Sequence, residues 1–258
     1  MKVHYFEDRK AAILHKAFTG ELTKEWREKR QIPIDSWVAE RIEARFDVTG
    51  GLQKTPSRSP RDNPIPYITV ANVFRNYIKF SEIRYFEVTK EELERLQLKN
   101  KDLLIVEGNG SGNEIGRCAM WHNELPVCIH QNHIIRARAK TDNTSPEFVL
   151  YYLNSPDGSA IVREKAVTTA GLYNLSVGKV KTIVLSFPCI KEQQEIVRRL
   201  DAYLEKDVQI KESASSVLDQ IDTMKKSILA RAFRGELGTN DSQDENAVEL
   251  LKRVLSSG

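Results

Sequence analysis

Residues Lys191 to Phe233 read KEQQEIVRRLDAYLEKDVQIKESASSVLDQIDTMKKSILARAF. No proline or glycine interrupts the chain between Pro188 and Gly235. One helix of about 44 residues is predicted, about 66 Å long at a rise of 1.5 Å per residue. Residues along one side of it recur at alternating spacings of four and three: Ile196, Leu200, Tyr203, Asp207, Ile210, Ala214, Val217, Ile221, Met224, Ile228 and Arg231.

This seam predicts that the helix has a partner. Its period is close to 3.5 and its apolar stripe is narrow, as in a coiled coil. Asp207 and Arg231 interrupt the stripe and are expected to set its register or to pair with the partner. The alternative is a long surface helix that packs on its own domain. We expect a homodimer, and the residues expected in its interface are Ile196, Leu200, Tyr203, Ile210, Val217, Ile221, Met224 and Ile228.

The end of the predicted helix is repeated near the start of the chain, because KAAILHKAFTGEL (10–22) resembles KKSILARAFRGEL (225–237). The first copy predicts a short helix from Phe6 to Phe18 that ends before Gly20. Two copies separated by unrelated sequence do not make a solenoid. The residues common to both are Lys10, Ile13, Leu14, Ala17, Phe18, Gly20, Glu21 and Leu22, which recur as Lys225, Ile228, Leu229, Ala232, Phe233, Gly235, Glu236 and Leu237.

The block between the two copies has the texture of a mixed α/β domain. WVAERIEARFDV (37–48) predicts a short helix, and residues 50–66 form a loop rich in glycine and proline. Ser145 and Pro146 are a good N-cap and first-turn pair for a helix over 145–156, and a second helix is predicted over 157–166. Strands are predicted over 67–73, 77–80, 102–108, 117–121, 126–130, 133–139 and 182–188.

These elements predict an α+β chain: a mixed α/β domain followed by a long helix of coiled-coil type. The expected parts are residues 1–30 with the first copy of the repeated segment, 31–188 as the mixed α/β domain, 189–237 as the long helix, and 238–258 as a flexible linker with a short C-terminal helix.

The composition is that of a soluble globular protein, with 40% hydrophobic and 29% charged residues and a net charge of only +3. No apolar run approaches the roughly 20 residues of a membrane span, and the first residues lack the apolar core of a secretion signal. We therefore expect a cytoplasmic protein. Two short basic runs, KTPSRSPR (54–61) and IIRARAK (134–140), could contact phosphates.

Motifs for catalysis or for metal binding are not found in the sequence. The cysteines Cys118, Cys128 and Cys189 are widely spaced, and His130 and His133 alone do not make a metal site. The glycine-rich EGNGSGNEIG (107–116) lacks the Gly-Lys-Ser/Thr ending of a phosphate-binding loop. We predict no cofactor and no catalytic residue.

The polar loop residues suit DNA contacts better. Basic side chains contact phosphates, whereas Asn, Gln and Arg read base edges in the major groove. The residues predicted to contact DNA are Lys54, Arg58, Arg61, Asn109, Ser111, Asn113, Gln131, Asn132, His133, Thr168, Thr169, Tyr173 and Asn174.

Several segments together resemble the specificity subunit of type I restriction–modification systems. They are ILHKAFTGELTKEWR, SWVAERIEARFDVTGG, DLLIVEGNGSGNEIGRCAM, YYLNSP, GLYNLSVGKVKTIVLSFP, KEQQEIVRRLD and ILARAFRGEL, and they cover most of the chain in the order of that family. The most specific are the AF-x-GEL helix end and the EQ-x-x-IV helix start.

The resemblance implies a non-catalytic DNA-recognition subunit. In that family two recognition domains, each followed by a long spacer helix, read the two halves of an interrupted DNA target. The resemblance implies as partners double-stranded DNA, an adenine methyltransferase (modification) subunit and a restriction motor subunit. By this resemblance, residues 1–30 are the end of a spacer-helix region, 31–188 the target-recognition domain, and 189–237 the spacer and dimerisation helix. Because this sequence has one such domain, it is expected to be either a half-subunit that dimerises or a fragment of a longer subunit.

Two other functions are weighed against this one. A coiled-coil assembly adaptor without base-specific readout would rest on residues 190–235 alone. A small magnesium-dependent nuclease would rest on the glycine-rich loop with Asp102 and Glu107, but no lysine follows these acids in register.

Overall fold

The computed structural model describes residues 2–169, 172–237 and 247–256. The helices are α1 (Lys2–Phe18), η1 (Glu21–Thr23), α2 (Lys24–Glu28), η2 (Ile34–Ser36), α3 (Ile42–Arg45), η3 (Pro56–Arg58), α4 (Lys90–Leu96), α5 (Pro146–Asn154), α6 (Pro156–Lys165), α7 (Val177–Lys181), α8 (Ile190–Phe233) and α9 (Ala247–Ser256). The strands are β1 (Val38–Arg41), β2 (Phe46–Gly50), β3 (Pro64–Ile68), β4 (Val73–Phe74), β5 (Tyr77–Ile78), β6 (Arg84–Glu87), β7 (Leu103–Val106), β8 (Gly108–Asn109), β9 (Cys118–Met120), β10 (Ile129–His130), β11 (Ile134–Ala139), β12 (Val167–Thr169), β13 (Leu172–Asn174) and β14 (Val184–Phe187).

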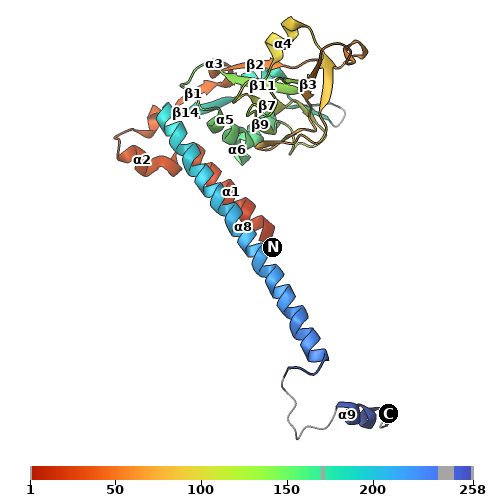
Figure 1. Ribbon diagram of the computed structural model, residues 1–258. Coiled ribbons are helices and arrows are strands. Elements are labelled where there is room, and N and C mark those ends of the chain that lie inside the picture. The colour runs from red at the N-terminus through yellow and green to blue at the C-terminus, as the bar shows by residue number, and fades with distance from the viewer. Residues whose placement is uncertain (1, 170–171, 238–246, 257–258) are drawn as a thin grey trace. The chain divides into compact units, whose positions relative to one another are not determined.

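The predicted fold class, a mixed α/β block with a long C-terminal helix, is confirmed (Figure 1). The helix α8 is 44 residues long, as the absence of proline and glycine predicted. The chain divides into two compact units, the first unit ending at Tyr203 and the second unit beginning at Leu204, and α8 continues across this division.

A four-stranded antiparallel sheet in the order β2-β11-β7-β9 forms the centre of the first unit. The β7 sequence LLIV is buried at every position because both faces of the sheet are covered. Leu103 and Ile105 belong to a core cluster on one face, whereas Leu104 and Val106 belong to a second cluster on the other. This continuous apolar strand therefore has the burial pattern of a central strand with two covered faces.

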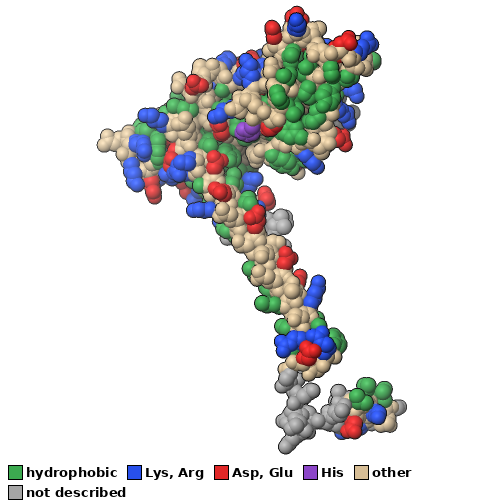
Figure 2. All heavy atoms as spheres, in the orientation of Figure 1, with side chains coloured by type: hydrophobic (Ala, Val, Ile, Leu, Met, Phe, Trp, Pro, Cys, Tyr) green, Lys and Arg blue, Asp and Glu red, His purple; other side chains and the backbone are tan. Residues whose placement is uncertain are grey.

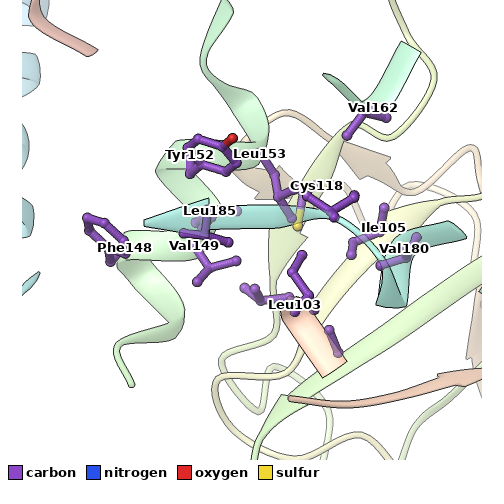
Figure 3. Packing of buried hydrophobic residues seen from close by; sticks show 14 of the residues in the cluster. Leu103, Ile105, Cys118, Phe148, Val149, Tyr152, Leu153, Val162, Val180 and Leu185 are labelled. Atoms are coloured by element: carbon purple, nitrogen blue, oxygen red, sulfur yellow. The ribbon is translucent and has the colours of Figure 1, made fainter. Parts of the chain in front are cut away.

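Helices α5 and α6 cover the Leu103 face. Ser145 accepts a hydrogen bond from the Phe148 amide and Pro146 occupies the first turn, so the predicted cap of α5 is confirmed. Val149 and Leu153 of α5 point toward Leu103 and Ile105, and Phe148 lies on another side of α5 in the same buried cluster (Figure 3).

The first turns of α8 also belong to this core. Ile196 and Leu200 are fully buried in the same cluster as Leu14 and Ala17 of α1. The Arg9 side chain of α1 donates to the Tyr203 hydroxyl at 3.0 Å. The beginning of the predicted seam is therefore covered by the chain's own first unit. Further along the seam, Ile210, Val217, Ile221, Met224 and Ile228 are exposed.

The helix predicted over residues 37–48 is wrong. Only α3 is helical there, and it is flanked by β1, which pairs with β14, and by β2, which pairs with β11. Phe46 and Val48 are buried while Asp47 between them is exposed, which is the alternation of a strand. The strand predicted over 67–73 is also too long, because Asn72 accepts a hydrogen bond from the Thr69 amide and closes a turn.

The predicted linker over residues 238–246 lies outside the described residues. The C-terminal helix α9 is described, with Val248, Leu251, Val254 and Leu255 exposed. Among the helices that the structure describes, none is both long enough and apolar enough to span a membrane.

Candidate nucleic-acid interface

Three of the loops predicted to contact DNA lie side by side at the end of β7. Glu107 follows β7, and its backbone amide donates to the His133 carbonyl at 2.9 Å. Its own carbonyl accepts a hydrogen bond from the Leu175 amide at 2.7 Å. The glycine-rich loop, the Gln131–His133 turn and the segment after β13 are therefore held together by main-chain hydrogen bonds, although they are far apart in the sequence.

The glycine-rich loop and the β12–β13 hairpin form one small sheet. β13 pairs with β8 on one side and with β12 on the other, which places Tyr173 opposite both Asn109 and Thr168. A Cβ atom on Gly112 would lie 2.9 Å from Cζ of Tyr173, so glycine lets this aromatic ring lie against the loop backbone. Tyr173 is half-buried, and Asn174 is exposed beside it.

Two arginines that the sequence did not single out hold the tip of the glycine-rich loop. Arg163 of α6 donates to Oδ1 of Asn113 at 3.4 Å, and Arg75 donates to the Asn113 carbonyl oxygen. Ser111 Oγ accepts a hydrogen bond from the Asn113 amide at 3.3 Å. Ser111 and Asn113 nevertheless remain exposed, so the loop is braced from behind while its polar side chains reach solvent.

The loop that carries Lys54 reaches the same surface. The Leu52 amide donates to the His130 carbonyl, and the Asn132 amide donates to the Leu52 carbonyl, both at 2.9 Å. Gly51 is required here because a Cβ atom would lie 2.2 Å from the His130 carbonyl oxygen. Lys54 is exposed just beyond this contact.

Arg58 and Arg61 lie further along that loop, at the corner between β6 and α4. The Arg58 guanidinium donates to both carboxylate oxygens of Glu92, at 2.9 and 2.7 Å. This ion pair raises the pKa of Arg58 and lowers the pKa of Glu92. The Arg61 side chain is exposed, while its backbone amide donates to Glu87.

The arginines of the second basic run are paired with carboxylates. Arg136 is buried and pairs with Asp47 at 2.9 Å. Arg138 pairs with the fully buried Asp102 at 2.6 Å. The suggestion that this run contacts phosphates is therefore wrong for Arg136, whose side chain points into the protein. Because strand residues alternate between faces, the sequence alone did not show which face these arginines lie on.

The two acids considered for a nuclease have different surroundings. Asp102 is fully buried, and its carboxylate accepts hydrogen bonds from Arg138 and from the Lys99 amide. Glu107 is half-buried, with its carboxylate 3.7 Å from His133, and burial raises its pKa. A buried aspartate bound to arginine is not accessible to a metal ion and a phosphate. In the part of the chain that the structure describes, no group of three or more His, Cys, Asp or Glu is placed to hold a metal ion.

His130 lies beneath the Gln131–His133 turn. It is fully buried, and its Nδ1 is 2.9 Å from the Ile134 carbonyl oxygen. Burial lowers the pKa of His130 to about 4, so the ring is neutral at pH 7. Among the described residues, its Nε2 has no hydrogen-bond partner. Protonation would therefore place an uncompensated charge under the turn.

Acid is expected to loosen this turn through His130. Because the pKa in the folded state is below that of an unfolded histidine, near 6.5, the unfolded chain takes up the proton first as the pH falls. The free energy of unfolding should fall between about pH 6.5 and pH 4, by at most about 3 kcal/mol, and His130→Gln should flatten this part of the curve. Urea unfolding at a series of pH values measures it. An unchanged pH slope in the variant would contradict the assignment.

Comparison with known proteins gives a consistent family. Residues 47–220 match the family described as type I restriction modification DNA specificity domain. The specificity subunit of the type I restriction enzyme EcoKI from Escherichia coli K12 is 31% identical over 94% of this chain and 54% of that subunit. The StySPI specificity subunit from Salmonella potsdam is 27% identical over 88% of this chain and 48% of its own length. The chain thus spans about half the length of these curated relatives.

Solved structures agree in fold. The HsdS subunit from Thermoanaerobacter tengcongensis superposes with a TM-score of 0.59 over 91% of this chain and 52% of that chain, at 17% sequence identity. At this identity the likeness shows the fold alone. The assignment to a DNA-specificity component, rather than to an enzyme, rests on the sequence matches. With a family match over residues 47–220 and a relative that is 31% identical over 94% of this chain, the chain belongs to the type I restriction modification DNA specificity domain family.

Proposed function

We propose that this chain reads one half of an interrupted DNA target and positions the partner subunits of a type I restriction–modification complex on it. The observation that supports this most directly is the row of adjoining loops at the end of β7. It displays polar side chains at a surface whose backbone is held by main-chain hydrogen bonds, by strand pairing and by the Arg75 side chain. A rigid scaffold beneath exposed polar loops is the usual arrangement for base readout.

Within this surface we assign roles by chemistry. Lys54 and Arg61 contact phosphates, and Arg58 joins them if its pair with Glu92 opens. Tyr173 lies against Gly112 and supports the loop tip. The residues proposed to face base edges or the sugar–phosphate backbone are Asn109, Ser111, Asn113, Gln131, Asn132, His133, Thr168, Thr169 and Asn174.

The proposed assembly is a homodimer that forms through the exposed part of α8. The second half-site would then be read by a second copy, and twofold symmetry would require identical half-sites in inverted orientation. The apolar residues that α8 leaves exposed, Ile210, Val217, Ile221, Met224 and Ile228, support this arrangement. The adenine methyltransferase and the restriction subunit are the proposed partners of the dimer. They would supply the chemistry, including extrusion of the adenine from the duplex.

Binding of the full chain to fluorescent duplex DNA tests this proposal. Lys54→Ala should weaken binding to duplexes of any sequence. It should also reduce the slope of log K against log[salt] by about 1, the value for one lost phosphate contact. Asn174→Ala should instead relax the preference for one base of the methylated sequence when the dimer is combined with its methyltransferase. The discrimination against the wrong base at that position should fall by about 1–3 kcal/mol.

Lys24→Ala is the matched control for lysine removal, because Lys24 is exposed on α2 and away from these loops. Its DNA affinity should equal that of the unmodified chain. If neither loop variant alters affinity or the methylated sequence while the dimer persists, the recognition surface is wrong and the assembly-adaptor function is favoured.

A further inference from the structure

The two copies of the repeated segment have the same local structure. The first copy ends α1 at Phe18, with Gly20 at φ 80°, and the second ends α8 at Phe233, with Gly235 at φ 72°. A glycine in the left-handed region two residues past the last helical phenylalanine ends both helices. The repeat in sequence is therefore also a repeat in structure.

Their surroundings differ completely. In the first copy Leu14 and Ala17 are buried, and Phe18 makes edge contacts with Phe148 and Tyr152 of α5, with ring centroids 5.3 and 5.2 Å apart. In the second copy every residue from Lys225 to Leu237 is exposed, and Phe233 is 90% exposed. Figure 2 shows hydrophobic side chains at the surface near the C-terminal end of α8.

The positions that match between the copies are, with one exception, the buried or half-buried ones. In the first copy the matching residues are all buried or half-buried except Glu21. Every non-matching residue there is exposed except the half-buried Ala11. His15, for example, is exposed even though it pairs with Asp157 of α6, and Ala230 stands at its position in the second copy. The second copy therefore carries the docking residues without a surface to dock on.

We infer that the groove on α5 and α6 that holds residues 10–22 is also the receptor for residues 225–237 of a second copy of this chain. We call it the helix-end groove, and Phe148 and Tyr152 of α5 are the residues in it that contact Phe18. In this arrangement α1 occupies the groove from within its own chain, and the end of α8 competes for it from the other copy. The inference rests on the proposed homodimer.

Competition follows from the chemistry of the groove. Ile228, Leu229, Ala232 and Phe233 offer the same apolar shapes as Ile13, Leu14, Ala17 and Phe18. A tethered α1 has the advantage of high effective concentration. In a dimer each copy's α8 end would dock on the other copy. Once the first end has docked, the second docks within the same complex, so it also has a high effective concentration, which offsets that of α1.

Photo-cross-linking of the full chain tests the inference. Phe233→p-benzoylphenylalanine keeps an aromatic side chain at the docking position, and an equimolar mixture of isotopically heavy and light copies separates cross-links between copies from those within one copy. We expect heavy–light cross-links to α5, centred on Phe148 and Tyr152. Phe18→Ala should weaken the competing α1 and lower the protein concentration for half-maximal cross-linking at least tenfold. Tyr152→Ala should raise that concentration.

Val254→p-benzoylphenylalanine is the control, because Val254 is similarly exposed on α9 but lies outside the repeat. It should give no cross-link to α5. Circular dichroism on each variant verifies that the fold is intact. The Phe233 probe in a chain that keeps Phe18 gives a result even if the Phe18→Ala variant unfolds.

The possible results are distinguishable. One result is a dimer by light scattering in which the Phe233 probe reacts only with α8 of the other copy, or does not react. That result overturns the helix-end groove as the receptor and leaves the proposed homodimer intact. If the Phe233 probe cross-links only to α5 of its own copy, the inference that a second copy supplies the helix end is wrong. A chain that stays monomeric at every concentration overturns both.

Discussion

Glu192→Ala is expected to lower the free energy of unfolding of the first unit by about 3–5 kcal/mol, the cost of breaking a buried ion pair. Glu192 is fully buried in the first turn of α8. Its Oε1 accepts hydrogen bonds from Arg27 at 2.6 Å and from Thr23 at 2.7 Å, and its Oε2 accepts one from Trp37 Nε1 at 3.1 Å. The variant leaves a buried guanidinium and two polar groups without their acceptor.

Glu195→Ala is the matched control in the same helix. Glu195 pairs with Arg198 and Arg199, and these ion pairs lower the pKa of Glu195 to about 2. Because Arg198 is largely exposed, water replaces the lost partner, and the loss should be under about 1 kcal/mol. Urea unfolding followed by circular dichroism compares the two.

A double variant, Glu192→Ala with Arg27→Ala, separates the pair from its surroundings. Since each single change leaves a charge or its partners unpaired, the double variant should lose less stability than the two single variants added together. Additive losses would show that the carboxylate and the guanidinium are not coupled, and would contradict the proposed cause of the large effect.

Local signals in the sequence predicted the elements whose causes are local. The 44-residue α8 follows from an uninterrupted helical period between Pro188 and Gly235, and the start of α5 follows from Ser145 and Pro146. β1 was misassigned as helix because its stability comes from pairing with β14, as in Val38 opposite Phe187. That partner is distant in sequence, so local propensity carries no information about it.

In the candidate interface too, local features are predictable from the sequence and contacts between distant segments are not. Its residues are predicted from their polar or basic side chains and their places in loops. Their proximity depends on hydrogen bonds such as Leu175 to Glu107 and Glu107 to His133, which no local sequence pattern indicates. The capping box of Thr89 and Glu92 was a readable signal for α4 that the sequence interpretation missed. The buried role of Arg136 was not readable, because Asp47 becomes its partner only when β2 pairs with β11.

The seam of α8 provides the second large expected effect. Val217→Asp combined with Ile221→Asp should raise the dissociation constant of the proposed homodimer at least about 100-fold, because burying these carboxylates in an apolar interface is costly. Both residues are exposed in the single chain, at 53% and 41%, so the change should leave the stability of the first unit unaltered. Sedimentation or light scattering across a concentration series measures the shift from dimer to monomer.

The control places the same two charges on another face of α8. Ser216 and Thr223 are exposed and lie off the seam, so Ser216→Asp with Thr223→Asp should keep the dimer while matching the net charge and the approximate helix propensity. If both pairs of substitutions dissociate the dimer equally, general charge repulsion would explain the effect and the seam would not be the interface. If only the seam pair does so, and the methylated site is lost along with the dimer, then dimerisation through α8 is what brings two recognition surfaces onto one interrupted target.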